Sequence, residues 1–172
     1  MSQSHFIEGP LLPSWIQEQM SLCGREQRDE QMFSQAAAAG IGAMASFQGI
    51  IRADAWQGQT VQAMEYSAYL PLAERLFAQM EQRITEQYGL RELRIWHSLG
   101  LVHAGECSML VLAASGHRAE AFEGLRAAVE AVKAEAPVWK RERFASGQYR
   151  WVEGPVSPHF ETGRIRTKVS DK

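Results

Sequence analysis

The stretch that decides the fold is Leu93-Arg94-Ile95-Trp96-His97-Ser98-Leu99-Gly100-Leu101, whose odd-numbered residues are Leu or Ile apart from His97. This alternation predicts a half-buried β-strand. After Gly105, the more uniformly apolar residues 107–114 predict a second strand. Residues 117–134 carry apolar side chains at helical spacing, so they predict an amphipathic helix that ends before Pro137.

The rest of the chain shows the same two periodicities. Pro71 opens another amphipathic helix, which ends before Gly89, and a strand with a bulge at Gly49 is expected within residues 42–52. The further predicted elements are a short strand at 7–10, helical pieces within 11–39 broken near Cys23-Gly24, a strand at about 60–67, and hairpin strands at 138–144 and 148–152. On the 117–134 helix, the side chains expected to face the core are Phe122, Leu125, Val129 and Val132.

These elements predict one α+β domain at 1–153, with a helical excursion within 10–40 and a loosely ordered tail at 154–172. No apolar run approaches the roughly 20 residues of a membrane span, and the first residues lack a secretory signal pattern. Two cysteines are too few for a disulfide framework, and Cys107 opens an apolar run that indicates a buried, inert thiol. The protein is therefore expected to be cytoplasmic and independent of membranes.

The net charge of −2 gives no indication of nucleic-acid binding, but the charge is unevenly distributed. Residues 1–116 contain 7 basic and 12 acidic side chains, whereas residues 117–172 contain 11 and 8. Of the 18 basic residues 14 are Arg, and the predicted domain keeps Lys only at Lys133 and Lys140. A lysine amine can lose its proton and act as a nucleophile or acid–base group, whereas Arg stays protonated. Chance and genome composition are the competing explanations of both biases.

Ser115-Gly116-His117-Arg118 lies where a buried strand is predicted to turn into a helix. Exposed backbone N–H groups and the helix dipole favour a bound phosphate there, with Arg118 as a bidentate contact. The alternative is that Ser115 caps the helix and Arg118 is solvated. Arg52, which ends its predicted strand, is a candidate for a second phosphate contact.

Lys140, Arg141 and Glu142 follow Pro137 in a predicted strand. Lys140 and Glu142 then share one face and Arg141 lies on the other, and Glu142 can pair with either of its basic neighbours. An ordinary charged strand edge explains the same residues, because Lys at an edge discourages aggregation. His97 is expected to be a core histidine, and no group of residues has the spacing of a metal site.

Several segments, in their order along the chain, resemble the large, catalytic subunit of molybdopterin synthase. The resemblance covers about residues 40–152 and the N-terminal strand, and its specific part is His-Arg-x-x-Ala-Phe followed by Lys, Pro, Trp and Lys. The matching segments are Ile7-Glu8-Gly9-Pro10-Leu11, Gly42-Ala43, Phe47-Gln48-Gly49-Ile50-Ile51-Arg52, Met64-Glu65-Tyr66 with Tyr69, Trp96-His97-Ser98-Leu99-Gly100, Gly105-Glu106, His117-Arg118-Ala119-Glu120-Ala121-Phe122-Glu123, Lys133, Pro137-Val138-Trp139-Lys140-Arg141-Glu142 and Trp151-Val152.

The resemblance implies a hammerhead-like α+β fold with a mixed, largely antiparallel sheet and two main packed helices. It implies an enzyme of molybdenum cofactor biosynthesis that adds two sulfurs to cyclic pyranopterin monophosphate, so that the dithiolene of molybdopterin forms. The sulfur is expected as a thiocarboxylate on the C-terminal Gly-Gly of a small ubiquitin-like partner subunit. Large subunits are expected to form a homodimer within a heterotetramer, with no bound metal or cofactor.

The resemblance also implies which residues form the site. Lys133 and Lys140 are implied as the catalytic amines, and the implied substrate contacts are Ile50, Ile51, Arg52, His117, Arg118, Lys133, Lys140, Arg141 and Glu142. Helix geometry adds an inference that does not depend on the family. Arg118 and Lys133 are 15 residues apart, so on one helix they stand about 22 Å from each other. If both serve one site, they must come from different subunits.

Two positions depart from the family pattern. Ser98 stands where the family commonly has an arginine, and Glu153-Gly154-Pro155 stands where it has a basic residue after Trp151-Val152. The alternative function is therefore a non-catalytic module that binds a ubiquitin-like sulfur carrier. The presence of both Lys133 and Lys140 argues against that alternative.

Overall fold

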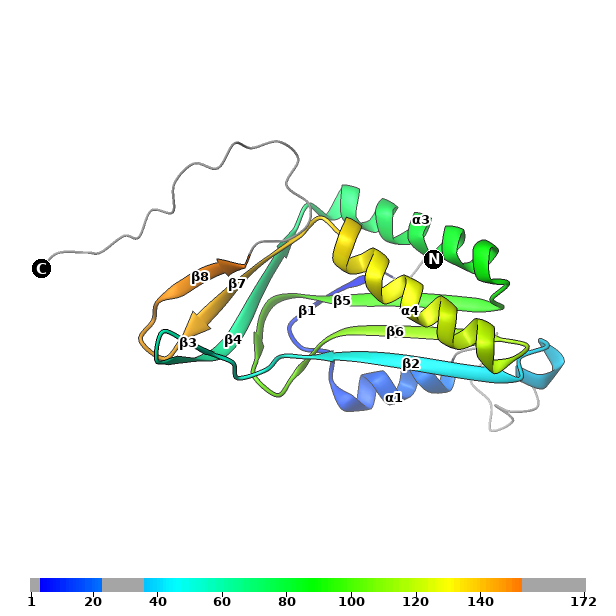
Figure 1. The fold of residues 1–172 in the computed structure, drawn as a ribbon, viewed down its shortest axis with the longest axis horizontal. Coiled ribbons are helices and arrows are strands. Elements are labelled where there is room, and N and C mark those ends of the chain that lie inside the picture. The colour runs from blue at the N-terminus through cyan, green and yellow to red at the C-terminus, as the bar shows by residue number, and fades with distance from the viewer. Residues whose placement is uncertain (1–3, 23–35, 153–172) are drawn as a thin grey trace, which may run out of the picture.

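A computed structural model describes residues 4–22 and 36–152 (Figure 1). The predicted strands and the two long helices are confirmed to within two residues at each end. The elements are β1 (Phe6–Glu8), α1 (Pro13–Leu22), β2 (Ala43–Ile50), β3 (Ala55–Trp56), β4 (Gln59–Ala68), α3 (Leu70–Tyr88), β5 (Glu92–His103), β6 (Cys107–Ser115), α4 (Arg118–Glu135), β7 (Val138–Phe144) and β8 (Tyr149–Val152).

The strands form one sheet in the order β2-β6-β5-β4-β7-β8, with β1 beside β5 and β3 beside β4. All pairs are antiparallel except β1 with β5, so the predicted α+β fold with a mixed, largely antiparallel sheet is confirmed. The long strand β5 joins two halves of the sheet. Its residues 92–97 pair with β6, and its residues 100–103 pair with β4.

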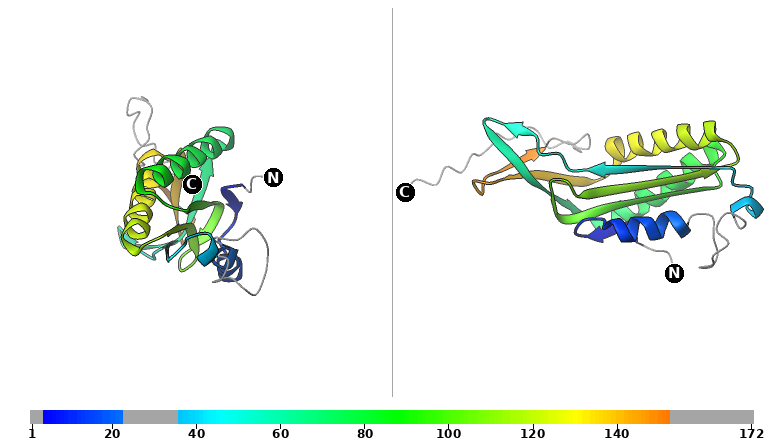
Figure 2. Two further views of the ribbon diagram at one scale, coloured as in Figure 1. Left: turned by 90° about the vertical axis from the view of Figure 1, so that its right-hand side faces the viewer. Right: turned by 90° about the horizontal axis from the view of Figure 1, so that it is seen from below.

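Helices α3 and α4 pack side by side on one face of the β2-β6-β5 half, and α1 lies on the opposite face (Figures 1 and 2). Phe77 of α3 and Ile95 and Val111 of the sheet are fully buried between these layers. Strands β4, β7, β8 and β3 extend beyond the ends of the helices (Figure 1). The junction between the helix-covered half and this extension is the position of the cavity described below.

Local sequence explains where the elements begin and end. Pro71 occupies the first turn of α3, and Gly89 ends that helix with a left-handed backbone (φ +63°). Gln57 (φ +48°) and Gly58 (φ +77°) form the two-residue turn between β3 and β4, a conformation that favours glycine. The bulge predicted at Gly49 is confirmed, because the register of β2 against β6 shifts between Gly49 and Ile50.

One part of the predicted core is wrong. Phe122 is 62% exposed, whereas the buried side of α4 consists mainly of small residues, Ala121, Gly124, Ala128 and Ala131, together with Val129 and Val132. Gly124 lets the helix approach the connection between α3 and β5 closely, since a Cβ there would lie 2.7 Å from the Leu90 side chain. The sequence pattern gave weight to large apolar side chains, but a closely packed helix buries its small ones.

Several other expectations concern burial and the ends of the chain. Cys107 is a buried free thiol, as predicted, and burial raises its pKa. Helix α1 occupies the first part of the expected 10–40 excursion, while residues 23–35 and the tail at 154–172 lie outside the described residues. None of the helices in the described ranges combines the length and hydrophobicity that a bilayer-spanning helix needs.

Candidate functional site

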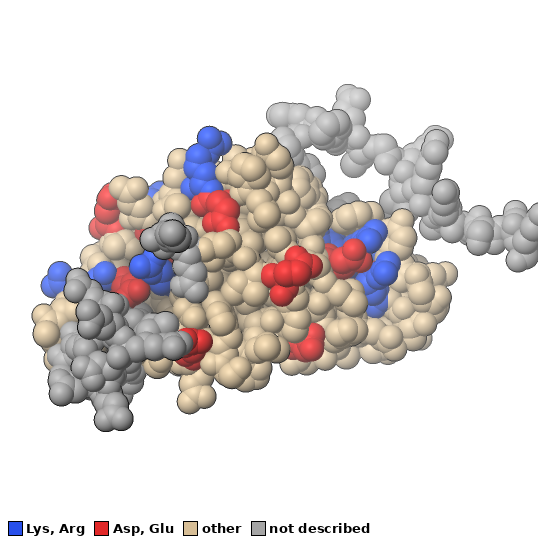
Figure 3. All heavy atoms as spheres, turned by 180° about the vertical axis from the view of Figure 1, so that it is seen from behind, with Lys and Arg blue, Asp and Glu red and all other residues tan. Residues whose placement is uncertain are grey.

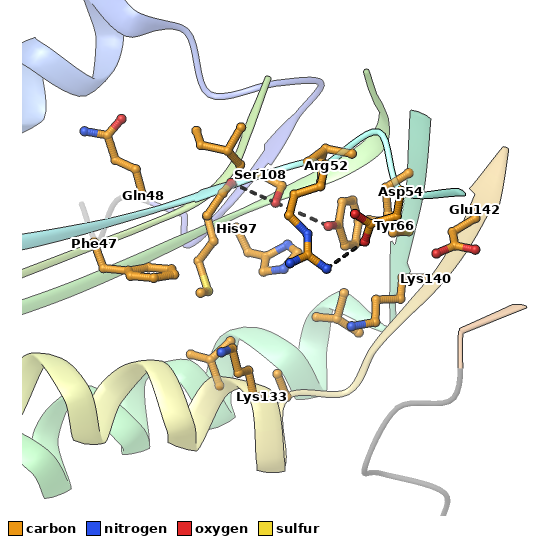
Figure 4. Close-up of a pocket in the computed structure, with 18 residues that line it drawn as sticks. Phe47, Gln48, Arg52, Asp54, Tyr66, His97, Ser108, Lys133, Lys140 and Glu142 are labelled. Atoms are coloured by element: carbon orange, nitrogen blue, oxygen red, sulfur yellow. Dashed lines mark hydrogen bonds and ion pairs between the residues drawn. The ribbon is translucent and has the colours of Figure 1, made fainter. Parts of the chain in front are cut away.

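A cavity of about 550 Å³ opens where the C-terminal end of α4 meets the junction of the two sheet halves (Figure 4). This volume is typical of a pocket for a small organic ligand. Helix α4 and strands β2, β4, β5, β6 and β7 contribute to its wall. The residues that line it are Phe47, Gln48, Gly49, Ile50, Ile51, Arg52, Asp54, Met64, Tyr66, His97, Ser108, Met109, Val132, Lys133, Ala136, Val138, Lys140 and Glu142.

The cavity brings Lys133 and Lys140 together. Pro137 imposes an extended backbone on Ala136 (φ −68°, ψ 126°), which ends α4 and directs the chain into β7. Lys133 therefore reaches the cavity from the last turn of the helix, and Lys140 reaches it from the strand (Figure 4). Neither amine lies within 4 Å of a carboxylate of the described residues, so both are available to an anionic ligand.

Arg52 and Asp54 lie at the rim of the cavity, on the segment that follows β2. The Nη2 of Arg52 donates to a carboxylate oxygen of Asp54 at 2.6 Å. The Arg52 side chain is 79% exposed and the Asp54 side chain is 54% exposed. An ion pair this exposed contributes little to stability. The Arg52 guanidinium can therefore leave Asp54 for a ligand anion at small cost.

A short hydrogen-bond chain crosses the floor of the cavity. The Tyr66 hydroxyl donates to the Ser108 hydroxyl at 3.2 Å, and the Ser108 hydroxyl donates to the Gly49 carbonyl at 3.2 Å (Figure 4). Burial raises the pKa of Tyr66, so the phenol remains protonated at neutral pH. The bulge at Gly49 brings the backbone close to Met109, since a Cβ there would lie 3.3 Å from the Met109 Cβ.

His97 is both a core residue, as predicted, and part of the cavity wall. Its Nδ1 lies 2.8 Å from the Ser98 carbonyl oxygen, which can only accept, so Nδ1 carries the hydrogen. Burial, with a smaller effect from the charge of Lys140, lowers the pKa of His97 to about 4. The ring is therefore neutral at pH 7 and packs edge-on against Tyr66, with 4.8 Å between ring centroids.

Glu142 is nearly buried and lines the cavity on the same face of β7 as Lys140. Glu142 pairs with neither of its basic neighbours in the strand. The carboxylate instead accepts a hydrogen bond at 2.7 Å from Nε of Arg150, which lies directly opposite in β8. The register between β7 and β8 brings Arg150 opposite Glu142, so the sequence next to Glu142 could not predict this pairing.

Three of the predicted contacts lie outside the cavity. Arg141 projects from the other face of β7, as the strand alternation predicted, and forms two hydrogen bonds with Glu65 at 2.9 and 2.7 Å. His117 and Arg118 lie at the opposite end of α4 from Lys133. Ser115 does not cap the helix, because its hydroxyl donates to the His117 carbonyl and the N-cap residue is His117. A role for these three residues in substrate binding stays a prediction.

Ser98, where the family resemblance leads us to expect an arginine, is fully buried and does not line the cavity. Its hydroxyl has no hydrogen-bond partner among the described residues. This position therefore contributes no charge to the cavity, and the cationic character rests on Arg52, Lys133 and Lys140.

Sequence reasoning missed part of the wall, chiefly Phe47, Asp54, Met64, Tyr66 and Ser108. Alternation along β4 places Met64 and Tyr66 on one face and would have paired them, but it could not show that this face meets α4. Within residues 4–22 and 36–152, no group of three or more His, Cys, Asp or Glu side chains could hold a metal ion. On the face drawn in Figure 3, basic and acidic side chains are mixed rather than gathered in one basic area.

Comparison with known proteins adds a second line of argument. The family model described as MoaE protein matches residues 25–135. The molybdopterin synthase catalytic subunit of Oryza sativa subsp. indica is 39% identical over 112 residues, which are 65% of this chain and 57% of the rice protein. The human protein of the same name is 35% identical over 103 residues, or 60% and 54% of the two chains. The match thus spans little more than half the length of these relatives.

Two solved structures share the fold. The molybdopterin synthase of Staphylococcus aureus aligns with a TM-score of 0.70 and 27% identity, over 89% of this chain and 98% of that one. The complex of subunits 1 and 2 of the molybdopterin-converting factor of Helicobacter pylori aligns with a TM-score of 0.65 and 24% identity, over 86% and 88%. The second likeness concerns the fold alone.

Proposed function

The chain belongs to the MoaE protein family, and from that premise we propose that it is the catalytic subunit of a molybdopterin synthase. Its substrate is cyclic pyranopterin monophosphate, and its product is molybdopterin. The sulfur donor is the thiocarboxylated C-terminal Gly-Gly of a small ubiquitin-like partner subunit. The protein acts as a cytoplasmic sulfurtransferase without a bound metal or cofactor.

The observation that carries this proposal is the convergence of Lys133 and Lys140 on one cavity with no internal carboxylate partner. The proposed substrate carries a phosphate, and the donor tail carries a thiocarboxylate. Both are anions, so the site must supply cations that no internal ion pair already occupies. The described part of the chain offers two such amines, together with Arg52 on an exposed pair that can open.

Lys133 and Lys140 then have two roles. As the thiocarboxylate sulfur attacks the pterin, they stabilise developing negative charge. As water then cleaves the acyl–sulfur bond and releases the carrier's C-terminal carboxylate, they supply and remove protons. Ile50, Ile51 and Glu142 complete the contacts with the substrate, and Arg52 binds the phosphate. Neutral His97 and protonated Tyr66 shape the floor without adding charge to it.

A second copy of the chain supplies the remaining contacts. Helix α4 is continuous from Arg118 to Glu135, so Arg118 and Lys133 of one chain stand about 22 Å apart. His117 and Arg118 can serve the cavity only from a partner subunit, in a homodimer with two composite sites. The small subunits at its two ends complete a heterotetramer.

The edge of the sheet supports this arrangement. Strand β2 ends the sheet, and its eight residues, Ala43–Ile50, include no charged side chain that would discourage pairing. Antiparallel pairing of two β2 strands about a two-fold axis brings Ala43 of one chain beside Ile50 of the other. Ile50 lines the cavity, and Ala43 pairs with Ser115, two residues before His117.

The synthase proposal is tested with the purified chain, a thiocarboxylated carrier and the cyclic precursor. Formation of the dithiolene product is expected. If the carrier binds and no dithiolene forms, the chain is instead a non-catalytic carrier-binding module.

The composite site is tested by mixing a Lys133→Ala chain with an Arg118→Ala chain. Each variant is expected to be inactive alone, and subunit exchange is expected to recover activity because the mixed dimer has one intact site. No recovery, with exchange verified by mass, would contradict the sharing of sites.

A further inference from the structure

The charged residues around the cavity divide into those with an internal partner and those without one. Asp54 binds Arg52, and Glu142 binds Arg150. Lys133 and Lys140 have no ion pair with any described residue. Arg150 is the only one of these six residues that does not line the cavity, and neither the sequence pattern nor the family resemblance pointed to it.

Two cations, Lys140 and Arg150, lie close enough to Glu142 to form an ion pair with its carboxylate. Lys140 is two residues away on the same face of β7, so their Cα atoms are about 6.6 Å apart, within reach of two long side chains. Glu142 is 8% exposed, and a carboxylate removed from water needs a partner. Without a competing cation, an ion pair between Glu142 and Lys140 is therefore the expected arrangement.

Glu142 pairs with Arg150 rather than Lys140 for three reasons. It lies directly opposite Glu142 in the β7–β8 register, and its Nε and Nη2 approach the same Glu142 oxygen at 2.7 and 2.5 Å. Its guanidinium lies 4.8 Å from the centroid of the Trp56 ring, which itself stacks on Phe144 with 5.7 Å between centroids. Finally, a guanidinium stays protonated at every physiological pH.

The consequence is visible at Lys140. Its amine is directed into the cavity toward the Lys133 side and away from Glu142 (Figure 4). We propose that Arg150 is a positioning residue, which binds the Glu142 carboxylate and so leaves the Lys140 amine without an internal counter-ion. The charge of Lys140 is then available to the anionic ligand. The ligand's identity rests on the proposed function, whereas the competition between Arg150 and Lys140 does not.

The test measures the pKa of Lys140 directly, by NMR titration of the lysine Cε and Hε signals in the full chain. Only four lysines are present, so the signals can be assigned by single substitutions. In Arg150→Met, Glu142 is expected to turn to Lys140 and raise its pKa by about 0.5–1 unit, because an opposite charge favours the ammonium form. In Arg150→Met with Glu142→Gln, the pKa of Lys140 is expected to return to the wild-type value.

Arg143→Met is the matched control. Arg143 is an arginine of β7 whose nearest carboxylate is Glu65, at 3.5 Å on the outer face of the strand, and it does not line the cavity. This variant is expected to leave the pKa of Lys140 unchanged. If Arg150→Met unfolds the protein, Arg150→Lys takes its place, with a smaller rise expected because lysine cannot form the forked contact. An unchanged Lys140 pKa in the folded variant, or an equal change in Arg143→Met, would overturn the proposal.

Turnover supplies an independent comparison. Arg150→Met is expected to lower kcat/KM for dithiolene formation about tenfold, and to have no further effect when Glu142→Gln is already present. An equal loss in both backgrounds would mean that Arg150 acts other than through Glu142. If the Lys140 pKa responds as expected and the wild-type chain makes no dithiolene, the synthase proposal fails and the positioning role of Arg150 stands.

Discussion

Lys140 and Arg141 are neighbours in β7, yet the two faces of the strand treat positive charge differently. On the outer face, Arg141 holds Glu65 through two hydrogen bonds and lies 4.9 Å from the ring centroid of Tyr149 and 5.5 Å from that of Trp151. On the cavity face, Lys140 has no ion pair with a described residue, and the nearby carboxylate of Glu142 is bound by Arg150. On this strand, the cation that supports the fold is ion-paired, whereas the cation that faces the proposed ligand is not.

This contrast shows that the presence or absence of an internal ion pair can distinguish a structural charge from a functional one, even where the residue type cannot. Hydrogen bonds from Arg141 hold the pKa of Glu65 below its ordinary value, so that carboxylate contributes to stability. An amine without a partner contributes little to stability and can bind an incoming anion.

The largest effect is expected on the cavity face. Lys133→Ala and Lys140→Ala should each lower turnover by about 10²–10⁴-fold, because each removes a group that moves protons or stabilises charge. The free energy of unfolding, measured by urea titration, should change by less than about 1 kcal/mol. Turnover within a few-fold of wild type in either variant would contradict the catalytic role assigned to that lysine.

The free energy of unfolding should also depend on pH differently for groups on the two faces. The pKa of His97 is about 4 in the folded protein against an ordinary 6.5, so the unfolded chain binds more protons between these values. The stability from neutral His97, about 3 kcal/mol, is complete above pH 6.5 and is lost as the pH falls toward 4. Unfolding at several pH values should show this slope, and His97→Gln should flatten it.

The outer face should respond only at lower pH. The pKa of Glu65 lies below its ordinary 4.5, so its contribution is present above that value and is lost as the pH falls through the lowered pKa. Glu65→Gln should therefore flatten the stability curve below pH 4.5 and leave the His97 window unchanged. A single acid transition that neither His97→Gln nor Glu65→Gln alters would show that the two groups do not lose their contributions in different pH ranges.

A smaller effect is expected at Arg141. Arg141→Ala removes the hydrogen bonds to Glu65 and should reduce the free energy of unfolding by about 1 kcal/mol. If Arg141 acts only through Glu65, turnover should stay within about twofold, since its guanidinium lies on the face away from the cavity. A large rise in KM would instead show that Arg141 contacts substrate or a partner chain, as the family resemblance implies.

The smallest effect is expected beside β1. A hydrogen bond to Glu81, with a second to Glu74, raises the pKa of His5, and the His5 carbonyl accepts from the backbone N–H of His97 at 2.8 Å. The stability from charged His5 is complete below pH 6.5 and is lost as the pH rises through the raised pKa. His5→Gln should remove this alkaline loss, whose direction is opposite to that of His97. Hydrogen exchange of the β1 amides would measure it locally.

The cavity was predictable in part. The scarcity of lysine singled out Lys133 and Lys140, and the family resemblance implied their roles. Alternation placed Arg141 on the opposite face of its strand, because alternation along one strand is a local property. The partner of Glu142 was not predictable, since Arg150 reaches it across a hairpin whose register depends on the turn. Tyr66 and Ser108 are 42 residues apart, and no local pattern relates them.

Periodicity and the positions of Gly and Pro were enough to predict the order and the bounds of the long helices and of every strand except β3, since each depends on a few neighbouring side chains. Helical rise alone also separated Arg118 from Lys133. Packing decided which face of α4 is buried, where the strands meet to form a cavity, and which carboxylate each arginine binds. These features depend on contacts between segments distant in the chain, which only the folded protein brings together.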